Sequence, residues 1–97
     1  MFGSYDCTTL KNLLEQGGRL IDVRSHFEYT QGALKGALNM PLEQFQYHVE
    51  NIEKDKPVLL YCRSGQRSEM AKRYLQSLGF ADVHNIGGYQ QLAGCDN

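Results

Sequence analysis

The sequence predicts an α/β domain in which helices flank a central, mainly parallel sheet. Short apolar runs alternate along the chain with segments that repeat apolar residues at helical spacing, the pattern of successive βαβ units. The strongest run, residues 58–61, is continuously apolar, as expected of a strand covered on both faces. Because 97 residues suffice for one domain but not for two, we expect a single domain over residues 1–97.

The first predicted helix follows Asp6, a residue type that caps helix N-termini well. Its apolar residues have helical spacing: Leu10, Leu13 and Leu14. The glycine pair at 17–18 should end this helix. Residues 19–23 come next and are predicted to form a short buried strand.

A second strand and a second helix are predicted in the middle of the chain. Residues 37–40 form a short apolar run after a loop bracketed by Gly32 and Gly36. Pro41 is suited to the first turn of a helix. The apolar stripe of that helix consists of Leu42, Phe45, Val49 and Ile52.

The second half of the chain begins with the buried strand at 58–61. A polar loop follows, and then a helix that should end at Gly79. The apolar residues of this helix are Met70, Ala71, Tyr74, Leu75 and Leu78. Residues 81–86 are predicted to form the last strand, 87–88 a turn, and 89–92 one turn of helix.

Charge is nearly balanced over the whole chain but not along it. Ten basic and eleven acidic residues give a formal net charge of −1, and no stretch approaches the ~20 apolar residues that cross a bilayer. This balance argues against nucleic acid or an anionic membrane as a partner, so we expect neither. Residues 61–73, however, carry a local charge of +3 from four basic residues and one acidic residue. The basic residues are Arg63, Arg67, Lys72 and Arg73.

The three cysteines, Cys7, Cys62 and Cys95, lack the spacing of a zinc site, so no metal ion is expected. One disulfide is possible by number, but a domain of this size does not require it. Free thiols are typical of a reducing compartment and the N-terminus lacks a secretory signal, so the sequence predicts a cytoplasmic protein. Cys95 lies in a polar tail, where we expect an incidental free thiol; the alternative is a resolving thiol for Cys62.

Cys62 carries the chemistry of the predicted site. It comes directly after the most buried strand and before a polar loop and a helix. It should therefore lie at the carboxyl edge of the sheet, where open α/β sheets bind ligands. Loop amides, the helix N-terminus and the cationic Arg63 and Arg67 all favour a thiolate at that position. The sequence thus predicts an activated nucleophile that needs no histidine base.

Several motifs stand in the order and at the spacing of a known family. They are Asp22-Val23-Arg24, Glu28-Tyr29, Gly36-Ala37-Leu38-Asn39-Met40-Pro41, the segment from Val58 to Ser68, and Ile86-Gly87-Gly88. Through them the sequence resembles the single-domain rhodaneses, a family of small sulfurtransferases. The loop that follows Cys62, Arg63-Ser64-Gly65-Gln66-Arg67-Ser68, is the most specific of these motifs.

This resemblance implies a rhodanese-like fold and covalent sulfur transfer. In the family, the cysteine that matches Cys62 attacks the outer sulfur of a small sulfur-oxyanion donor such as thiosulfate, sulfite leaves, and a cysteine persulfide remains. The acceptor that takes the sulfur is a thiol, cyanide in vitro, or a protein. The resemblance implies no metal or organic cofactor. The loop positions that match the family's substrate-binding residues are Arg63, Ser64, Gly65, Gln66 and Arg67.

Two other functions stay open at this stage. A persulfide carrier would use the same chemistry to serve a dedicated protein partner. A cysteine-dependent phosphatase or arsenate reductase would also use a thiolate in an anion-binding loop. Phosphatase loops have the spacing Cys-x5-Arg, whereas Cys62 and Arg67 have the spacing Cys-x4-Arg. The shorter loop makes a tighter cradle, better fitted to a sulfur atom than to a phosphate group.

The other polar residues near these motifs are predicted to be mainly structural. Asp22, Arg24 and Glu28 resemble the family's structural charges, which pair beneath the active-site face. Tyr61 is expected to pack on its strand rather than to donate a proton. Ser68 has two interpretations: its hydroxyl donates a hydrogen bond to the reacting sulfur, or it satisfies the first turn of its helix.

Overall fold

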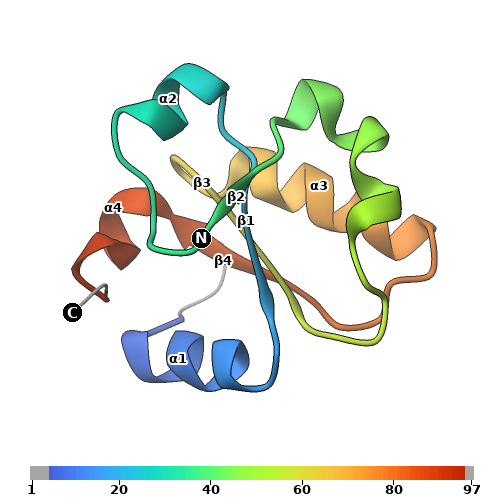
Figure 1. Cartoon of the computed structure of the whole chain (residues 1–97), viewed down its shortest axis with the longest axis horizontal. Coiled ribbons are helices and arrows are strands. Elements are labelled where there is room, and N and C mark those ends of the chain that lie inside the picture. The colour runs from blue at the N-terminus through green and yellow to red at the C-terminus, as the bar shows by residue number, and fades with distance from the viewer. Residues whose placement is uncertain (1–4, 96–97) are drawn as a thin grey trace.

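A four-stranded parallel sheet lies at the centre of the computed structural model, which describes residues 5–95 (Figure 1). The strands follow the order β2-β1-β3-β4, and each neighbouring pair is parallel. Their bounds are β1 (Arg19–Asp22), β2 (Leu38–Asn39), β3 (Val58–Cys62) and β4 (Val83–Gly88). The predicted α/β class, with a parallel sheet flanked by helices, is confirmed.

Helical segments cover both faces of this sheet (Figure 1). One face packs against α1 (Cys7–Glu15) and α4 (Tyr89–Leu92), and the other packs against α3 (Gln66–Ser77) and the 3-10 helices η1 (Leu42–Tyr47) and η2 (Val49–Asn51). The short α2 (His26–Thr30) and η3 (Ala93–Cys95) complete the set. Since successive strand residues point to opposite faces, Cys62 faces the α3 layer and Tyr61 faces the α1 layer.

Local interactions explain where the two longest helices begin and end. Asp6 caps α1, because its carboxylate accepts the backbone N–H of Thr9 at 2.8 Å. At the end of α3, Gly79 has a φ of +95° and the N–H of Phe80 donates to the Leu75 carbonyl at 3.1 Å. This is a Schellman motif, and its left-handed position favours glycine. Both predicted helix boundaries are confirmed.

The helix predicted after Pro41 is not continuous. Residues 42–51 form η1 and η2, held by short i→i+3 bonds such as those from the N–H of His48 to Phe45 and of Ile52 to Val49. Five of the ten residues in this segment are of types with weaker helix propensity: Phe45, Tyr47, His48, Val49 and Asn51. The segment nevertheless keeps its predicted apolar contacts, because Phe45 and Ile52 are buried in the core against α3.

The turn predicted at 87–88 is wrong. Gly87 and Gly88 belong to β4, where they pair with Tyr61 and Cys62 after a register shift in the β3–β4 ladder. The lack of a side chain at Gly88 allows β4 to approach a neighbouring segment closely, and it does not mark a turn. A Cβ atom on Gly88 would lie 2.6 Å from the carbonyl oxygen of Arg63, so the glycine lets β4 touch the loop that follows Cys62.

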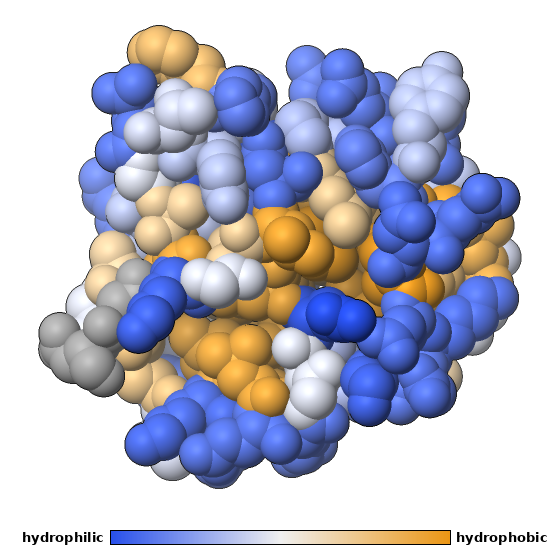
Figure 2. Space-filling model, in the orientation of Figure 1, coloured by the Kyte–Doolittle hydropathy of each residue, from blue (hydrophilic) through white to orange (hydrophobic). Residues whose placement is uncertain are grey.

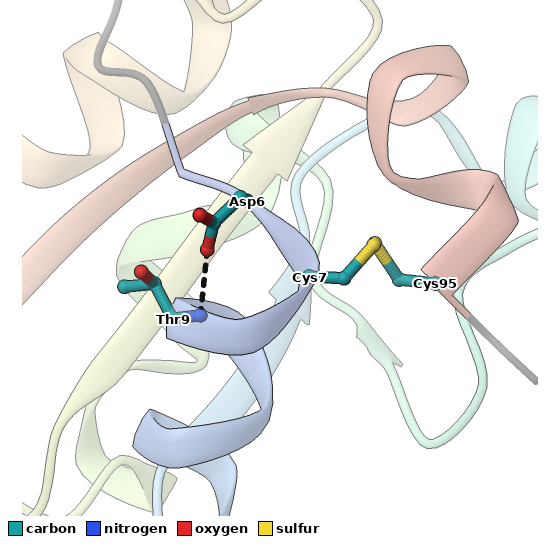
Figure 3. Close-up of a disulfide and its surroundings, with 4 residues drawn as sticks. All are labelled: Asp6, Cys7, Thr9 and Cys95. Carbon is teal, nitrogen blue, oxygen red and sulfur yellow. Dashed lines mark hydrogen bonds between the residues drawn. A yellow bond between two sulfur atoms is a disulfide. The ribbon is translucent and has the colours of Figure 1, made fainter.

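The expectation of free thiols at both chain ends is also wrong. Cys7 and Cys95 form a disulfide, with their Cα atoms 5.3 Å apart, and Cys62 is the one free cysteine (Figure 3). The pairing arises because α1 and the segment after α4 cover the same face of the sheet, which brings positions 88 residues apart in sequence into contact. The disulfide removes the argument from free thiols for a reducing compartment.

A hollow of about 490 Å³ lies beside this disulfide. Figure 2 shows apolar side chains gathered over the middle of the view, above α1. The hollow is lined by Cys7, Thr8, Leu10, Lys11, Leu14, Leu20, Leu34, Lys35, Gly94 and Cys95. None of these residues belongs to the loop after Cys62, so this hollow is not the predicted site. Among residues 5–95, no helix is long and apolar enough to span a membrane.

Candidate active site

Cys62 ends β3 at the carboxyl edge of the sheet, where the sequence places it. Its side chain is fully buried, with the ends of β1 and β4 on either side of its strand. Arg63 and Ser64 follow it as exposed residues, and α3 begins at Gln66. A buried thiol thus lies at the start of a three-residue connection, whose first two residues are exposed, and close to the N-terminus of a helix.

The backbone of the connection is shaped around the sulfur atom. Gly65 has a φ of +99°, and its N–H donates a hydrogen bond to Cys62 Sγ at 2.9 Å. A residue with a side chain is strained in this left-handed conformation, which explains the glycine at this position. Among the loop amides expected to turn toward the sulfur, that of Gly65 does so.

Hydrogen bonds favour the charged form of Cys62. Burial of the thiol disfavours ionisation, but hydrogen bonds from the Ser68 side chain and from the backbone of Ser68, Ser64 and Gly65 outweigh it. The pKa of Cys62 is therefore lowered from its ordinary value. A thiolate is the reactive form of cysteine, so these hydrogen bonds make Cys62 the candidate nucleophile of this site.

Asn85 is a part of the site that sequence reasoning missed. It lies in β4 with 4% of its surface exposed, and its side chain contacts the loop, the helix and its own strand. It accepts hydrogen bonds from Ser68 Oγ at 2.7 Å and from the N–H of Gly87 at 3.1 Å. It donates to the Gly65 carbonyl at 2.9 Å and to Glu69 Oε1 at 3.0 Å. The available signal was an amide residue inside a predicted strand, two positions before the Gly87-Gly88 pair.

Arg67 points to Glu28 rather than to the sulfur. Its two terminal nitrogens bind the two carboxylate oxygens at 2.7 and 3.0 Å, a bidentate pair that joins α3 to α2. The Arg67 guanidinium is the largest cause that holds the pKa of Glu28 at about 2. Glu28 also caps α2, because its carboxylate accepts the N–H of Ser25. The ion pair therefore fixes α2 next to the Cys62 loop.

The remaining predicted loop residues differ in their exposure to solvent. Arg63, Ser64 and Gln66 have exposed side chains, whereas Gly65 is buried against the sulfur. The structure therefore brings Gly65 and Ser68 to Cys62, engages Arg67 with α2, and leaves Arg63 as an exposed cation of the loop. Among residues 5–95, no three histidine, cysteine, aspartate or glutamate side chains cluster as metal ligands would.

A buried ion pair lies on the other face of the sheet, beneath the site. Asp22 is fully buried and binds the Arg24 guanidinium at 2.7 Å, and the Tyr61 hydroxyl donates to Asp22 at 2.8 Å. Burial is the main cause that raises the pKa of Tyr61 far above its ordinary value, so this hydroxyl stays protonated. The Arg24 guanidinium also lies 4.4 Å from the ring centre of Tyr89. The structural interpretation fits Asp22, Arg24 and Tyr61, whereas Glu28 pairs with the loop itself.

Comparisons with a family model and with known proteins identify the same family. The family model described as a Rhodanese-like domain matches residues 6–95. Uncharacterized protein YqhL of Bacillus subtilis is 36% identical over 98 residues, covering 93% of this chain and 78% of YqhL. Thiosulfate sulfurtransferase PspE of Escherichia coli is 36% identical over 75 residues, covering 75% of this chain and 72% of PspE. Several proteins named tRNA uridine(34) hydroxylase also match, and this chain spans 21–28% of their length.

Solved structures share the same architecture. A rhodanese with anions from E. coli has a TM-score of 0.74 and 33% identity, covering 78% of this chain and 92% of that one. The human single-domain sulfurtransferase TSTD1 has a TM-score of 0.70 and 29% identity, covering 90% and 91%. The motifs around Cys62, the parallel sheet and these matches lead to one conclusion: the chain belongs to the rhodanese-like domain family.

Proposed function

We propose that this protein is a sulfurtransferase that forms a persulfide on Cys62. The thiolate attacks the outer sulfur of a donor such as thiosulfate, the sulfur–sulfur bond of the donor breaks, and sulfite leaves with the electron pair. The outer sulfur of the new persulfide then carries the negative charge. A thiophilic acceptor takes this sulfur and regenerates the Cys62 thiolate, which makes the reaction a cycle of two half-reactions.

The observation that carries this proposal is the environment of the Cys62 sulfur. The thiol is free and buried, its pKa is lowered, and a backbone N–H points at it from 2.9 Å. Three residues separate the end of β3 from the N-terminus of α3, and the helix dipole favours an anion at this loop. The exposed Arg63 adds a positive charge where a sulfur oxyanion would arrive. The similarity to the thiosulfate sulfurtransferase PspE supports the same donor class.

A dedicated protein acceptor is the second form of this proposal. The tRNA uridine(34) hydroxylases contain a matching segment within a much longer chain, so the same domain occurs next to other protein parts. In that form, Cys62 would still be loaded by thiosulfate but would release its sulfur to cyanide very slowly. The two forms differ only in the second half-reaction.

The test is sulfur loading followed by sulfur release. Incubation with thiosulfate should add one sulfur atom to the wild-type chain, visible by intact mass spectrometry, and none to Cys62→Ser. The Cys7→Ser/Cys95→Ser double variant is the matched control and should load as wild type does. Addition of cyanide should then release thiocyanate. Hydrolysis of an aryl phosphate that Cys62→Ser loses, without any sulfur loading, would instead show a phosphatase.

A further inference from the structure

The side chain of Asn85 has only one possible orientation. Its Oδ1 lies 3.1 Å from the backbone N–H of Gly87, a group that can only donate. Its Nδ2 lies 2.9 Å from the carbonyl of Gly65, a group that can only accept. Exchanging the amide oxygen and nitrogen would place donor against donor and acceptor against acceptor. The oxygen of Asn85 therefore faces Ser68.

This orientation determines where the single hydroxyl proton of Ser68 points. The Ser68 oxygen lies 2.7 Å from Asn85 Oδ1 and 3.5 Å from Cys62 Sγ. Since Oδ1 can only accept, the hydroxyl donates to it over the shorter distance while the sulfur is uncharged. A negative charge on Sγ makes the sulfur the stronger acceptor. Because Ser68 is fully buried, solvent does not compete for its hydroxyl proton, and Asn85 Oδ1 and Cys62 Sγ compete with each other for it.

We propose that Asn85 is a positioning residue that competes with Cys62 Sγ for the Ser68 hydroxyl, so that this hydroxyl turns to the sulfur only while Sγ is charged. The inference rests on the proposed persulfide chemistry and deepens it. In the thiolate, Ser68 donates to Sγ. When the electron pair of the thiolate forms the new sulfur–sulfur bond, the charge moves to the outer sulfur and Sγ becomes neutral. The hydroxyl then returns to Asn85 instead of being left without an acceptor in the core.

The experiment measures the pKa of Cys62 from the pH dependence of its alkylation by iodoacetamide. Cys7 and Cys95 are protected by their disulfide, so the alkylation reports on Cys62 alone. Ser68→Ala should raise the pKa, because the thiolate loses a donor. Asn85→Ala should lower it by about one unit, because the hydroxyl then donates to Sγ without a competitor. In the Ser68→Ala/Asn85→Ala double variant the pKa should equal that of Ser68→Ala.

A merely structural role of Asn85 predicts the opposite sign. If Asn85 only held the Gly65 carbonyl in place, Asn85→Ala would weaken the bond from the Gly65 N–H to Sγ and raise the pKa of Cys62. The pKa of the double variant would then lie above that of Ser68→Ala instead of equalling it. Either result overturns the proposal. A pKa of Cys62 that is lower in the double variant than in Ser68→Ala would overturn it as well. If Asn85→Ala does not fold, Ser68→Ala decides alone, because an unchanged pKa there would show that the hydroxyl never reaches the sulfur.

Matched controls separate these effects from general destabilisation. Ser77→Ala removes a hydroxyl from the far end of α3, where it donates to the Tyr74 carbonyl at 2.6 Å. Asn39→Ala removes an amide in β2 that donates to the carbonyls of Asp22 and Arg24. Both should leave the pKa of Cys62 unchanged.

Thiosulfate loading measured on the same variants keeps this proposal distinct from the proposed function. Absence of sulfur loading in the wild type would contradict the sulfurtransferase but leave the expected pKa pattern intact. Loading with the wrong pKa pattern would contradict only the role of Asn85.

Discussion

The two cysteine sites of this protein differ in every respect that decides thiol chemistry. Cys62 is buried and free, and it accepts hydrogen bonds from the loop that follows it. Cys7 is exposed and paired with Cys95 at the surface, where it joins the two ends of the described chain (Figure 3). Position in the fold, not residue type, therefore decides between a buried free thiol with a lowered pKa and a structural cross-link.

The two sites also lie in different parts of the molecule. The Cys62 loop depends on contacts from α2, α3 and β4, through Glu28, Ser68 and Asn85. The disulfide belongs to the layer of α1 and α4 on the opposite face of the sheet. Changes at one site should therefore leave the other intact, and the following predictions test this independence.

Loss of the disulfide should have the largest effect, and on stability alone. The Cys7→Ser/Cys95→Ser double variant removes a cross-link between positions 88 residues apart, which should lower the free energy of unfolding by about 4 kcal/mol. Thermal unfolding by circular dichroism, with and without a reducing agent, measures this loss. Wild type with the reducing agent should unfold like the double variant without it. Sulfur loading by the folded protein should be unchanged, and a parallel loss of loading would show that the two sites are coupled.

Gly88→Ala should damage the Cys62 site without touching the disulfide. The new Cβ would lie 2.6 Å from the Arg63 carbonyl oxygen, so the loop must move away from β4. A displacement of this kind costs roughly 100-fold in the rate of sulfur loading. Gly94→Ala is the matched control, because nothing lies within 4 Å of the added Cβ there. Full activity in Gly88→Ala would show that the loop tolerates the shift.

Glu28→Gln should have the smallest effect, and one that depends on pH. The pKa of Glu28 is lowered to about 2 in the folded protein, so its ion pair with Arg67 stabilises the fold above the ordinary glutamate pKa of 4.5. That contribution is lost as the pH falls from about 4.5 toward 2. At pH 7 the variant should lose about 1 kcal/mol or less, because the pair is partly exposed to solvent.

Unfolding in urea at pH 7 and at pH 3 measures the effect of Glu28→Gln. The difference from wild type should shrink at the lower pH. Glu53→Gln breaks the exposed ion pair with Arg19, away from the Cys62 loop, and is the control for surface charge. A difference that grows as the pH falls would contradict the assigned role of the ion pair.

Local sequence signals sufficed for most of the fold. The apolar run at 58–61, the cap at Asp6 and the glycine at 79 each act within a few residues, so the sequence predicts β3, the start of α1 and the end of α3. The segment at 42–51 departs from its helical spacing because packing against α3 outweighs a weak local preference. Local signals were reliable wherever the deciding contacts are local.

In the candidate site, too, the contacts within one segment were predictable from the sequence, and the contacts between distant segments were not. Cys62 and Gly65 were predicted from one continuous loop, because the hydrogen bond between them spans three residues. The partners of Arg67 and Ser68 come from segments 39 and 17 residues away, and no local pattern indicates them. The positive charge of residues 61–73 was visible in the sequence, but Arg67 is engaged by Glu28 rather than directed at a substrate.

The sequence alone was enough to predict the α/β class, the position of Cys62 at the end of its strand and the family to which the chain is similar. These features depend on periodicity and on one continuous motif. Only the tertiary structure decided that Cys7 and Cys95 form a disulfide and that Asn85 lies behind the reactive sulfur. Both depend on contacts between segments far apart in the chain, which form only when the sheet and its two covering layers pack together.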